Sequence, residues 1–241
     1  MKIIAKYLGG SRIYDLAGPD SDYDYRGVFL NTDRSKILGL QKWSSRENRT
    51  DKESDYVLRE LTHFCVLLQK GNSEALDALW VEDADFTELQ PEFVAFRDQR
   101  DALIDSERLF SGLRGYLQGE FALAFGGKTG RLGHKRHEAI KAHGFSPKNV
   151  VQAVRLCEVG RHFFKTGVYH PKAQDEETQD SLRAIKFNPA LYSAEILKNY
   201  IHVKEEAMVR AYEKRIANFT FDKDLCNNLI VETYRKVLYE S

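Results

Sequence analysis

The sequence predicts an α+β protein, with a short mixed β-sheet and flanking helices followed by a mostly helical second half. Runs of apolar and aromatic residues at 2–8 and 22–30 have the composition of strands. From about residue 90 onward, apolar residues instead recur at helical spacing. We therefore expect two domains, residues 1–100 around the sheet and residues 101–241 built from helices.

The other elements of the first half follow from local signals. Residues 31–54 are polar and predict a loop or a short strand. The segment 55–58 is short and strand-like, and apolar residues at helical spacing follow it from Leu61 to Leu68. Gly71 and Asn72 are typical of a helix end, so a second helix is expected to begin at Ser73.

The second half contains four longer helical patterns. Pro91 suits the first turn of a helix that precedes them. The four patterns cover residues 106–125, 147–165, 193–217 and 222–239, and Gly167 is expected to end the second. Residues 126–147 are rich in glycine and basic side chains and have no clear pattern.

Composition limits the class of protein. The 241 residues have zero formal net charge, so total charge does not indicate a nucleic-acid partner. Charge is nevertheless uneven: residues 51–107 hold fifteen acidic and five basic side chains, whereas residues 128–172 hold ten Lys or Arg and two acids. That asymmetry favours an anionic ligand on the second half. The three cysteines predict buried thiols, and no segment resembles a membrane span or signal peptide, which indicates a cytoplasmic protein.

Two aspartates predict a metal site. Asp22 and Asp24 are two residues apart on an expected strand, so their carboxylates would share one face. Like charges this close are costly unless a cation neutralises them. Mg²⁺ suits such ligands, because it binds one or two carboxylates together with substrate phosphates.

The segment before these aspartates predicts a phosphate site. Gly10 and Ser11 follow the first strand, where a bare backbone can approach a ligand and a hydroxyl can donate to it. A helix beginning near Arg12 would aim its first N–H groups at phosphate, and Arg12 itself either binds the nucleotide or faces solvent. Arg26 shares the face of Asp24 and either reaches a triphosphate or only balances the acidic pair. Phosphate and metal sites side by side are typical of phosphoryl or nucleotidyl transfer.

These segments resemble a known family. Gly10–Tyr14 and Pro19–Val28 are similar to the signature of the DNA polymerase β superfamily of nucleotidyltransferases, and in particular to its RNA-ligase-associated polymerase-β-like members. The segments 55–64, 71–80 and 148–156 resemble later family motifs. The resemblance implies a nucleotidyltransferase core, two Mg²⁺ ions (Mn²⁺ can substitute), and Asp55 as a third carboxylate, with Glu53 as its competitor. The chain departs from the family pattern at Asp15, where glycine is usual, at Ser73, where proline is usual, and at Gln152, where histidine is common.

The same resemblance and the basic second half suggest further ligand contacts. Lys148 and Arg155 are two helical turns apart and share a face, so both are candidates for binding triphosphate, or are ordinary surface bases. The segment 126–137 is either a loop that grips a nucleic-acid backbone or a solvated basic loop. Its histidines, His134 and His137, have no suitably spaced metal-ligating partner.

The sequence thus predicts a nucleotidyltransferase that moves a nucleoside monophosphate from a nucleoside triphosphate to an acceptor hydroxyl and releases pyrophosphate. The association with RNA ligases implies an RNA or single-stranded DNA end as the acceptor, bound through the basic segment 128–172. Two alternatives stay open: a protein or small-molecule acceptor, and a non-catalytic sensor of nucleotide or RNA.

Overall fold

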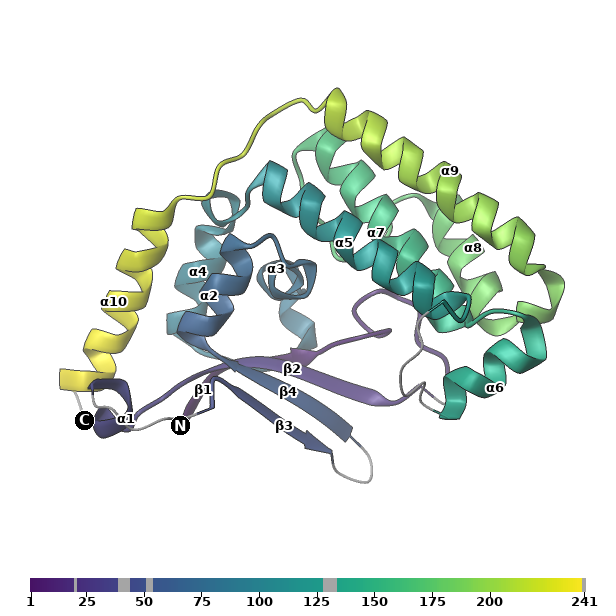
Figure 1. Ribbon diagram of the computed structural model, residues 1–241. Coiled ribbons are helices and arrows are strands. Elements are labelled where there is room, and N and C mark those ends of the chain that lie inside the picture. The colour runs from purple at the N-terminus through teal and green to yellow at the C-terminus, as the bar shows by residue number, and fades with distance from the viewer. Residues whose placement is uncertain (20, 39–43, 51–53, 128–133, 240–241) are drawn as a thin grey trace. The chain divides into compact units, whose positions relative to one another are not determined.

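The computed structural model describes residues 1–241 except 20, 39–43, 51–53, 128–133 and 240–241, and it describes only the backbone of residues 49, 50, 54, 55, 237 and 238. The chain forms two compact units (Figure 1). Unit 1 comprises Met1–Arg108 and Phe219–Ser241, and unit 2 comprises Leu109–Asn218.

A five-stranded mixed sheet forms the centre of unit 1. Its strands are β1 (Lys2–Leu8), β2 (Tyr23–Leu30), β3 (Arg46–Thr50), β4 (Ser54–Glu60) and β5 (Phe86–Leu89). Their order across the sheet is β3-β4-β2-β1-β5. The β2–β4 pair is parallel, whereas the β1–β2, β1–β5 and β3–β4 pairs are antiparallel. The two strands that carry the predicted carboxylates are therefore neighbours that run in the same direction.

Three helices cover one face of this sheet (Figure 1): α2 (Leu61–Gln69), α3 (Ser73–Trp80) and α4 (Pro91–Asp98). Side chains at their N-termini accept backbone N–H groups, Glu60 for α2 and Asn72 for α3. The rings of Phe64 on α2 and Phe86 on β5 lie against Phe93 of α4, with centroids 5.7 and 6.3 Å away. A short helix, α1 (Arg34–Leu38), and two single turns, Asp83–Asp85 and Arg100–Leu103, complete this part of the chain.

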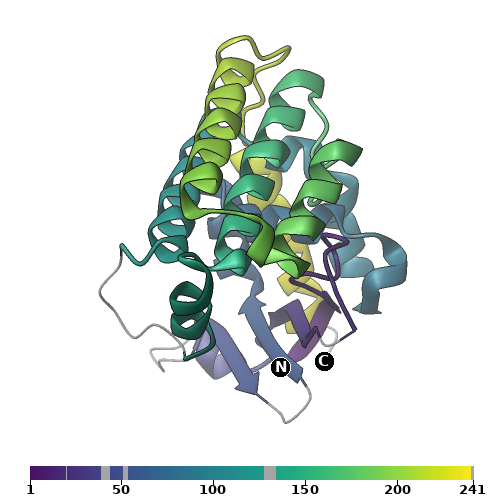
Figure 2. The ribbon, with the colours of Figure 1, turned by 90° about the vertical axis from the view of Figure 1, so that its right-hand side faces the viewer.

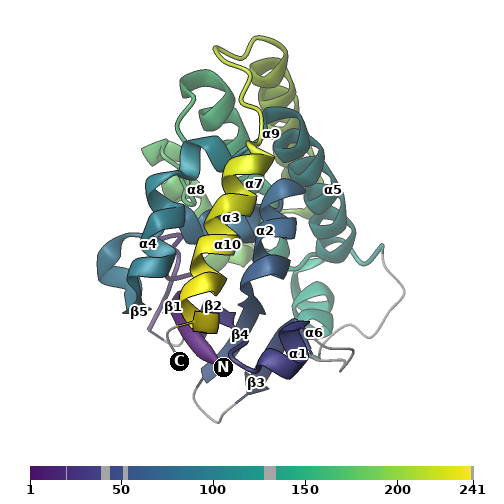
Figure 3. The same cartoon turned by 90° about the vertical axis from the view of Figure 1, so that its left-hand side faces the viewer.

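The last helix of the chain, α10 (Lys223–Tyr239), also belongs to unit 1 and lies beside α2 and α4 (Figure 3). Its Tyr234 hydroxyl donates to the buried carboxylate of Glu60. Two further bonds join the segments that enter and leave unit 1: Ser106 N donates to Phe219 O (3.0 Å), and Phe219 N donates to Ser106 Oγ (2.9 Å). Unit 1 is therefore made from two separate stretches of the chain.

Unit 2 is helical. Its elements are α5 (Ser106–Ala124, whose first residues lie in unit 1), α6 (His134–His143), α7 (Pro147–Thr166), α8 (Glu176–Phe187), the turn Pro189–Leu191 and α9 (Ala194–Glu213). Helices α8 and α9 both pack against α7 (Figure 2). Gly167 ends α7 with φ at +76°, a left-handed conformation that suits glycine.

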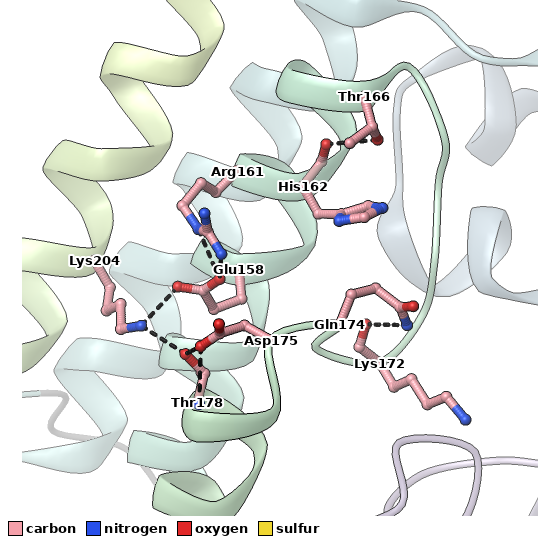
Figure 4. Close-up of polar contacts among 9 residues, drawn as sticks. All are labelled: Glu158, Arg161, His162, Thr166, Lys172, Gln174, Asp175, Thr178 and Lys204. Carbon is pink, nitrogen blue, oxygen red and sulfur yellow. Dashed lines mark hydrogen bonds and ion pairs between the residues drawn. The ribbon is translucent and has the colours of Figure 1, made fainter.

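A charged cluster joins these three helices (Figure 4). Glu158 on α7 has only 2% of its side chain exposed, and it pairs with Arg161 at 2.7 Å and with Lys204 of α9 at 2.8 Å. The Lys204 ammonium also donates to the hydroxyl of Thr178 on α8. A buried carboxylate is costly without partners. Removing either Arg161 or Lys204 would therefore lower the free energy of unfolding of unit 2 more than removing one member of an exposed ion pair would.

The predicted fold class is confirmed: a mixed sheet with flanking helices precedes helices alone. The compact units divide the chain differently from the predicted 1–100 and 101–241 domains. Unit 1 extends to Arg108 and also includes the segment that begins at Phe219. The structure also contains β5, α6 and α8, which the sequence analysis did not predict. Cys65, Cys157 and Cys226 are buried, as predicted. Within the described ranges, no helix is long and apolar enough to cross a bilayer.

Candidate active site

The turn after β1 places glycine backbone against the start of β2. Gly9 N donates to Asp24 O over 2.6 Å. Gly10 has φ at +60°, and a Cβ atom added to it would lie 2.6 Å from Asp24 Oδ2. A side chain at this position would displace the Asp24 carboxylate, so the Gly10 backbone lies directly beside that carboxylate. The structure thus brings together two of the predicted phosphate- and metal-site residues.

The chain from Ser11 to Leu16 forms one tight turn. Leu16 N donates to Ser11 O over 2.8 Å and Asp15 N to Arg12 O over 3.1 Å, a pattern that closes helices at their C-terminal ends. Asp15 has φ at +56°, which stops any helix here. In the described chain between β1 and β2, the helix considered near Arg12 is therefore absent. The left-handed conformation also explains why glycine suits the position of Asp15.

The three predicted carboxylate residues lie at the starts of β2 and β4. Asp24 is the second residue of β2 and is partly exposed. Asp22 is exposed and immediately precedes β2. The prediction that Asp22 lies within the strand is therefore wrong. The parallel register pairs Asp24 with Asp55, whose backbone alone is described. Glu53, the competing third carboxylate, lies outside the described residues.

The carboxylates of Asp22 and Asp24 lack an ion-pair partner among the described residues. Neither forms an ion pair or a side-chain hydrogen bond with any residue that the structure describes. Two uncompensated carboxylates next to an open glycine backbone fit a divalent cation, which prefers such oxygen ligands. Among the described side chains, which exclude that of Asp55, no three His, Cys, Asp or Glu residues are grouped as metal ligands.

Arg26 is fixed by a carboxylate on α3. It lies two residues beyond Asp24 on the same face of β2, and Gly9 packs against its side chain. Its Nη2 is 3.8 Å from Glu74 Oε1, and Arg59 Nη2 donates to Glu74 Oε2 over 2.7 Å. One carboxylate therefore holds two guanidinium groups, Arg26 from β2 and Arg59 from β4.

A buried hydrogen bond ties the glycine turn to the same helix. The Tyr14 hydroxyl donates to Asp77 Oδ2 over 2.7 Å, and both residues are buried. Burial, together with the nearby negative charges of Asp77 and Glu74, raises the pKa of Tyr7, whose side chain faces the same region. Through Asp77 and Glu74, α3 thus positions both the turn and Arg26.

The sequence analysis missed Glu74, Asp77 and Arg59 as site residues. Glu74 and Asp77 are three residues apart, so they share one face of α3. The available signals were this spacing and the resemblance of the segments 55–64 and 71–80 to family motifs, because the contacts themselves join separate segments. Arg12, by contrast, was predicted to bind nucleotide. Its guanidinium lies 3.7 Å from the centre of the Tyr23 ring, and Nη2 donates to Ser21 O over 3.0 Å.

The remaining predicted residues belong to unit 2. Lys148 is exposed in the first turn of α7. Arg155 is 1% exposed, with Nε donating to Gln152 and Nη1 to the carbonyl of Pro171. Both stay predictions as nucleotide-binding residues. Of the basic stretch 126–137, residues 128–133 lie outside the described part. His134 forms an exposed pair with Glu138 at 3.4 Å.

Comparison with known proteins now gives these residues a context. A profile of the RNA repair pathway DNA polymerase beta family matches residues 1–137, which include the glycine turn, the three carboxylate positions and α3. The chain belongs to this family. Membership supports a general nucleotidyltransferase role and confirms the resemblance found in the sequence.

Two individual proteins are also similar to this polymerase beta family chain. An uncharacterized 38.9 kDa protein from the nrdC–mobD intergenic region of Enterobacteria phage T4 is 31% identical over 86 residues. The match covers 33% of this chain and 26% of the phage protein, about a quarter of its length. A crystal structure of a nucleotidyltransferase-like protein from Exiguobacterium sibiricum aligns with 98% of this chain and 74% of its own, at 11% identity. Its TM-score of 0.30 is too low to establish a shared fold.

Proposed function

We propose that this protein is a metal-dependent nucleotidyltransferase that joins a nucleoside monophosphate to the end of a nucleic-acid strand. The observation behind this proposal is the contact between the Gly10 backbone and the Asp24 carboxylate, in a chain of the polymerase beta family. In this contact, the Gly10 backbone, which a phosphate can approach, lies beside a carboxylate that forms no ion pair with a described residue. Lys148 and Arg155 are further candidates for triphosphate contacts.

The chain's own residues would each have a defined part in the reaction. The acceptor hydroxyl attacks the α-phosphorus, the bond from that phosphorus to the β-bridging oxygen breaks, and pyrophosphate leaves with the bonding electrons. The Asp55 carboxylate would accept the proton of the hydroxyl. Ser11 Oγ and the neighbouring N–H groups would donate to β- or γ-phosphate oxygens, and Arg26 would offset their charge.

Asp22 and Asp24, with Asp55, are the residues that would hold two Mg²⁺ ions. Bound there, the ions would lower the pKa of the acceptor hydroxyl and neutralise charge on the leaving pyrophosphate. Mn²⁺ should substitute, because it also prefers oxygen ligands.

The test is transfer of label from each α-³²P-labelled nucleoside triphosphate, with Mg²⁺ or Mn²⁺, to small RNA, single-stranded DNA or protein from a cell extract. We expect label on a nucleic-acid end, and its loss in the D22A/D24A double variant. Asp101→Ala is the matched control, because Asp101 is exposed and has no ion pair in the described part of the chain. Label that persists in the double variant would refute the assignment of the carboxylates.

Two other outcomes decide between the alternatives. Label on protein or on a small molecule would retain the reaction and replace the acceptor. Tight nucleotide binding without transfer to any acceptor would favour a non-catalytic sensor. The two uncompensated carboxylates argue against a sensor, because a module that only binds a nucleotide has no evident need for two unpaired negative charges beside a phosphate.

A further inference from the structure

The sheet of unit 1 presents a row of tyrosines on the face opposite α2, α3 and α4. Tyr7 lies on the helix-covered face, where its ring is 5.5 Å from that of Phe86. Side chains alternate along a strand, so Lys6 points to the other face. The register pairs Leu8 with Tyr25 and Tyr25 with Tyr56, which places both tyrosines on that second face as well.

Two cations lie against these rings. Lys6 Nζ is 5.0 Å from the centre of the Tyr25 ring and 5.8 Å from that of Tyr56. Tyr23, two residues before Tyr25 and thus on the same face, stacks with Arg12 at 3.7 Å. We call these five residues, Lys6, Arg12, Tyr23, Tyr25 and Tyr56, the tyrosine face.

The tyrosine face is accessible. Tyr23 is 46% exposed, and Lys6, Arg12, Tyr25 and Tyr56 are each partly exposed. Tyrosines that pack a core would be buried, as Tyr7 is on the other side of the sheet. The exposed ring of Tyr23 and the partly exposed rings of Tyr25 and Tyr56 therefore form a surface that a second molecule can contact.

The two cations of this face have no ion-pair partner. Within the described residues, neither Lys6 nor Arg12 forms an ion pair, and the hydrogen-bond acceptor of Arg12 is the neutral carbonyl of Ser21. On the opposite face, in contrast, Arg26 and Arg59 share the single negative charge of Glu74. The register also pairs Lys6 with Glu88 of β5, so this carboxylate shares the face. Two cations against that one acid still leave a net positive charge beside the rings, which complements an anionic polymer.

Single-stranded nucleic acid has this combination of properties. Proteins bind it by stacking bases on aromatic side chains and by placing cations along its backbone. Tyr23 and Tyr25 are about 6.6 Å apart along β2, and Tyr25 and Tyr56 about 4.8 Å apart across neighbouring strands. Successive bases of an extended strand can use rings at such spacings. A duplex cannot, because its bases are already stacked on each other.

We propose that the tyrosine face binds single-stranded nucleic acid and guides it to the start of β2. Tyr23 is the first residue of β2 and lies between Asp22 and Asp24 in the sequence, so this end of the tyrosine face meets the predicted metal site at the edge of the sheet, where Asp24 points to the opposite face. The proposal rests on the proposed function in one respect only, because the bound strand is taken to be the acceptor.

The test measures binding without catalysis. Fluorescence anisotropy of a labelled oligouridine, with the corresponding oligodeoxythymidine and a duplex for comparison, gives the affinity of the protein at several salt concentrations. We expect Tyr23→Ala to weaken binding of the single strand about tenfold. Lys6→Gln should weaken it and reduce the slope of log affinity against log salt by about 0.7, the value for one phosphate contact on a single strand.

Two control variants remove the same groups elsewhere. Tyr239→Ala removes a ring that is 82% exposed on α10, and Lys223→Gln removes an exposed charge on the same helix. Neither should alter binding. If Tyr23→Ala and Lys6→Gln bind like these controls, or if the duplex binds as well as the single strand, the tyrosine face is not the site.

The result is independent of the transfer reaction. An Asp24→Asn variant should retain the affinity for oligouridine, because binding does not use that carboxylate. Label transfer that fails in the wild-type protein would refute the proposed function but leave the binding result intact. Equal affinity for oligouridine and oligodeoxythymidine would support a binding surface that accepts RNA and DNA alike.

Discussion

Replacing Gly10 by alanine should separate activity from stability. The new Cβ would lie 2.6 Å from Asp24 Oδ2, about 0.8 Å inside the distance at which ordinary van der Waals contact begins, 3.4 Å. The carboxylate must therefore move by nearly 1 Å. Displacement of a reacting group by that amount typically costs about 100-fold in rate. The left-handed backbone adds about 1–2 kcal/mol of strain, which lowers the free energy of unfolding by that amount.

The assay compares kcat/KM for label transfer with urea unfolding of the same variants. Gly115→Ala is the matched control, since no atom lies within 4 Å of its added Cβ and the residue is in the middle of helix α5. It should raise the free energy of unfolding by about 0.5–1 kcal/mol and leave transfer unchanged. If Gly10→Ala retains activity within about threefold of the wild-type value, the contact with Asp24 is not part of the catalytic site.

Three further predictions concern the residues that support the site and unit 2. Glu74→Gln removes the charge that holds two partly buried arginines and should lower the free energy of unfolding by about 1 kcal/mol in urea titration. Tyr14→Phe removes a buried hydrogen bond to the Asp77 carboxylate and should cost about 2 kcal/mol in the same assay. Burial and the adjacent His170 lower the pKa of His162 below its ordinary 6.5. As pH falls, His162 is therefore protonated at a higher pH in the unfolded chain than in the folded protein. The free energy of unfolding should decrease as pH drops through 6.5, and His162→Gln should reduce that dependence.

Each of these variants has a counterpart on the surface. Glu213→Gln and Tyr239→Phe change exposed side chains for which no partner is present in the described part of the chain, and His137→Gln changes an exposed histidine on α6. They should match the wild-type protein in urea and in the pH dependence of unfolding. If a variant and its surface counterpart change the free energy of unfolding equally, the contacts assigned to Glu74, Tyr14 or His162 do not explain the effect.

The sequence was most informative where function depends on adjacent residues. The pair of aspartates and the preceding Gly10 could be recognised because all three residues lie within a stretch of fifteen residues. In the structure, Gly10 and Asp24 are in contact. Helix positions were also predictable wherever an apolar stripe was long, as in α7 and α9.

Features that depend on distant segments could not be predicted. Glu74 contacts Arg26 across 48 residues, and periodicity does not reveal which strand a helix will cover. The strand β5 has only four residues, in an acidic stretch, so its strand character comes from pairing with β1. For α10, the apolar pattern predicted a helix but contained no information about the unit on which it packs.

The return of α10 to unit 1 has a consequence for the order of folding during synthesis. Unit 2 is continuous from Leu109 to Asn218, so all of its residues leave the ribosome before α10 does. The sheet with α2, α3 and α4 emerges before unit 2, yet Glu60 at the start of α2 lacks the Tyr234 hydroxyl until α10 is made. We therefore expect Met1–Arg108 to reach its native stability only after α10 has been made. Nascent chains that end before Lys223 should expose apolar surface at α2.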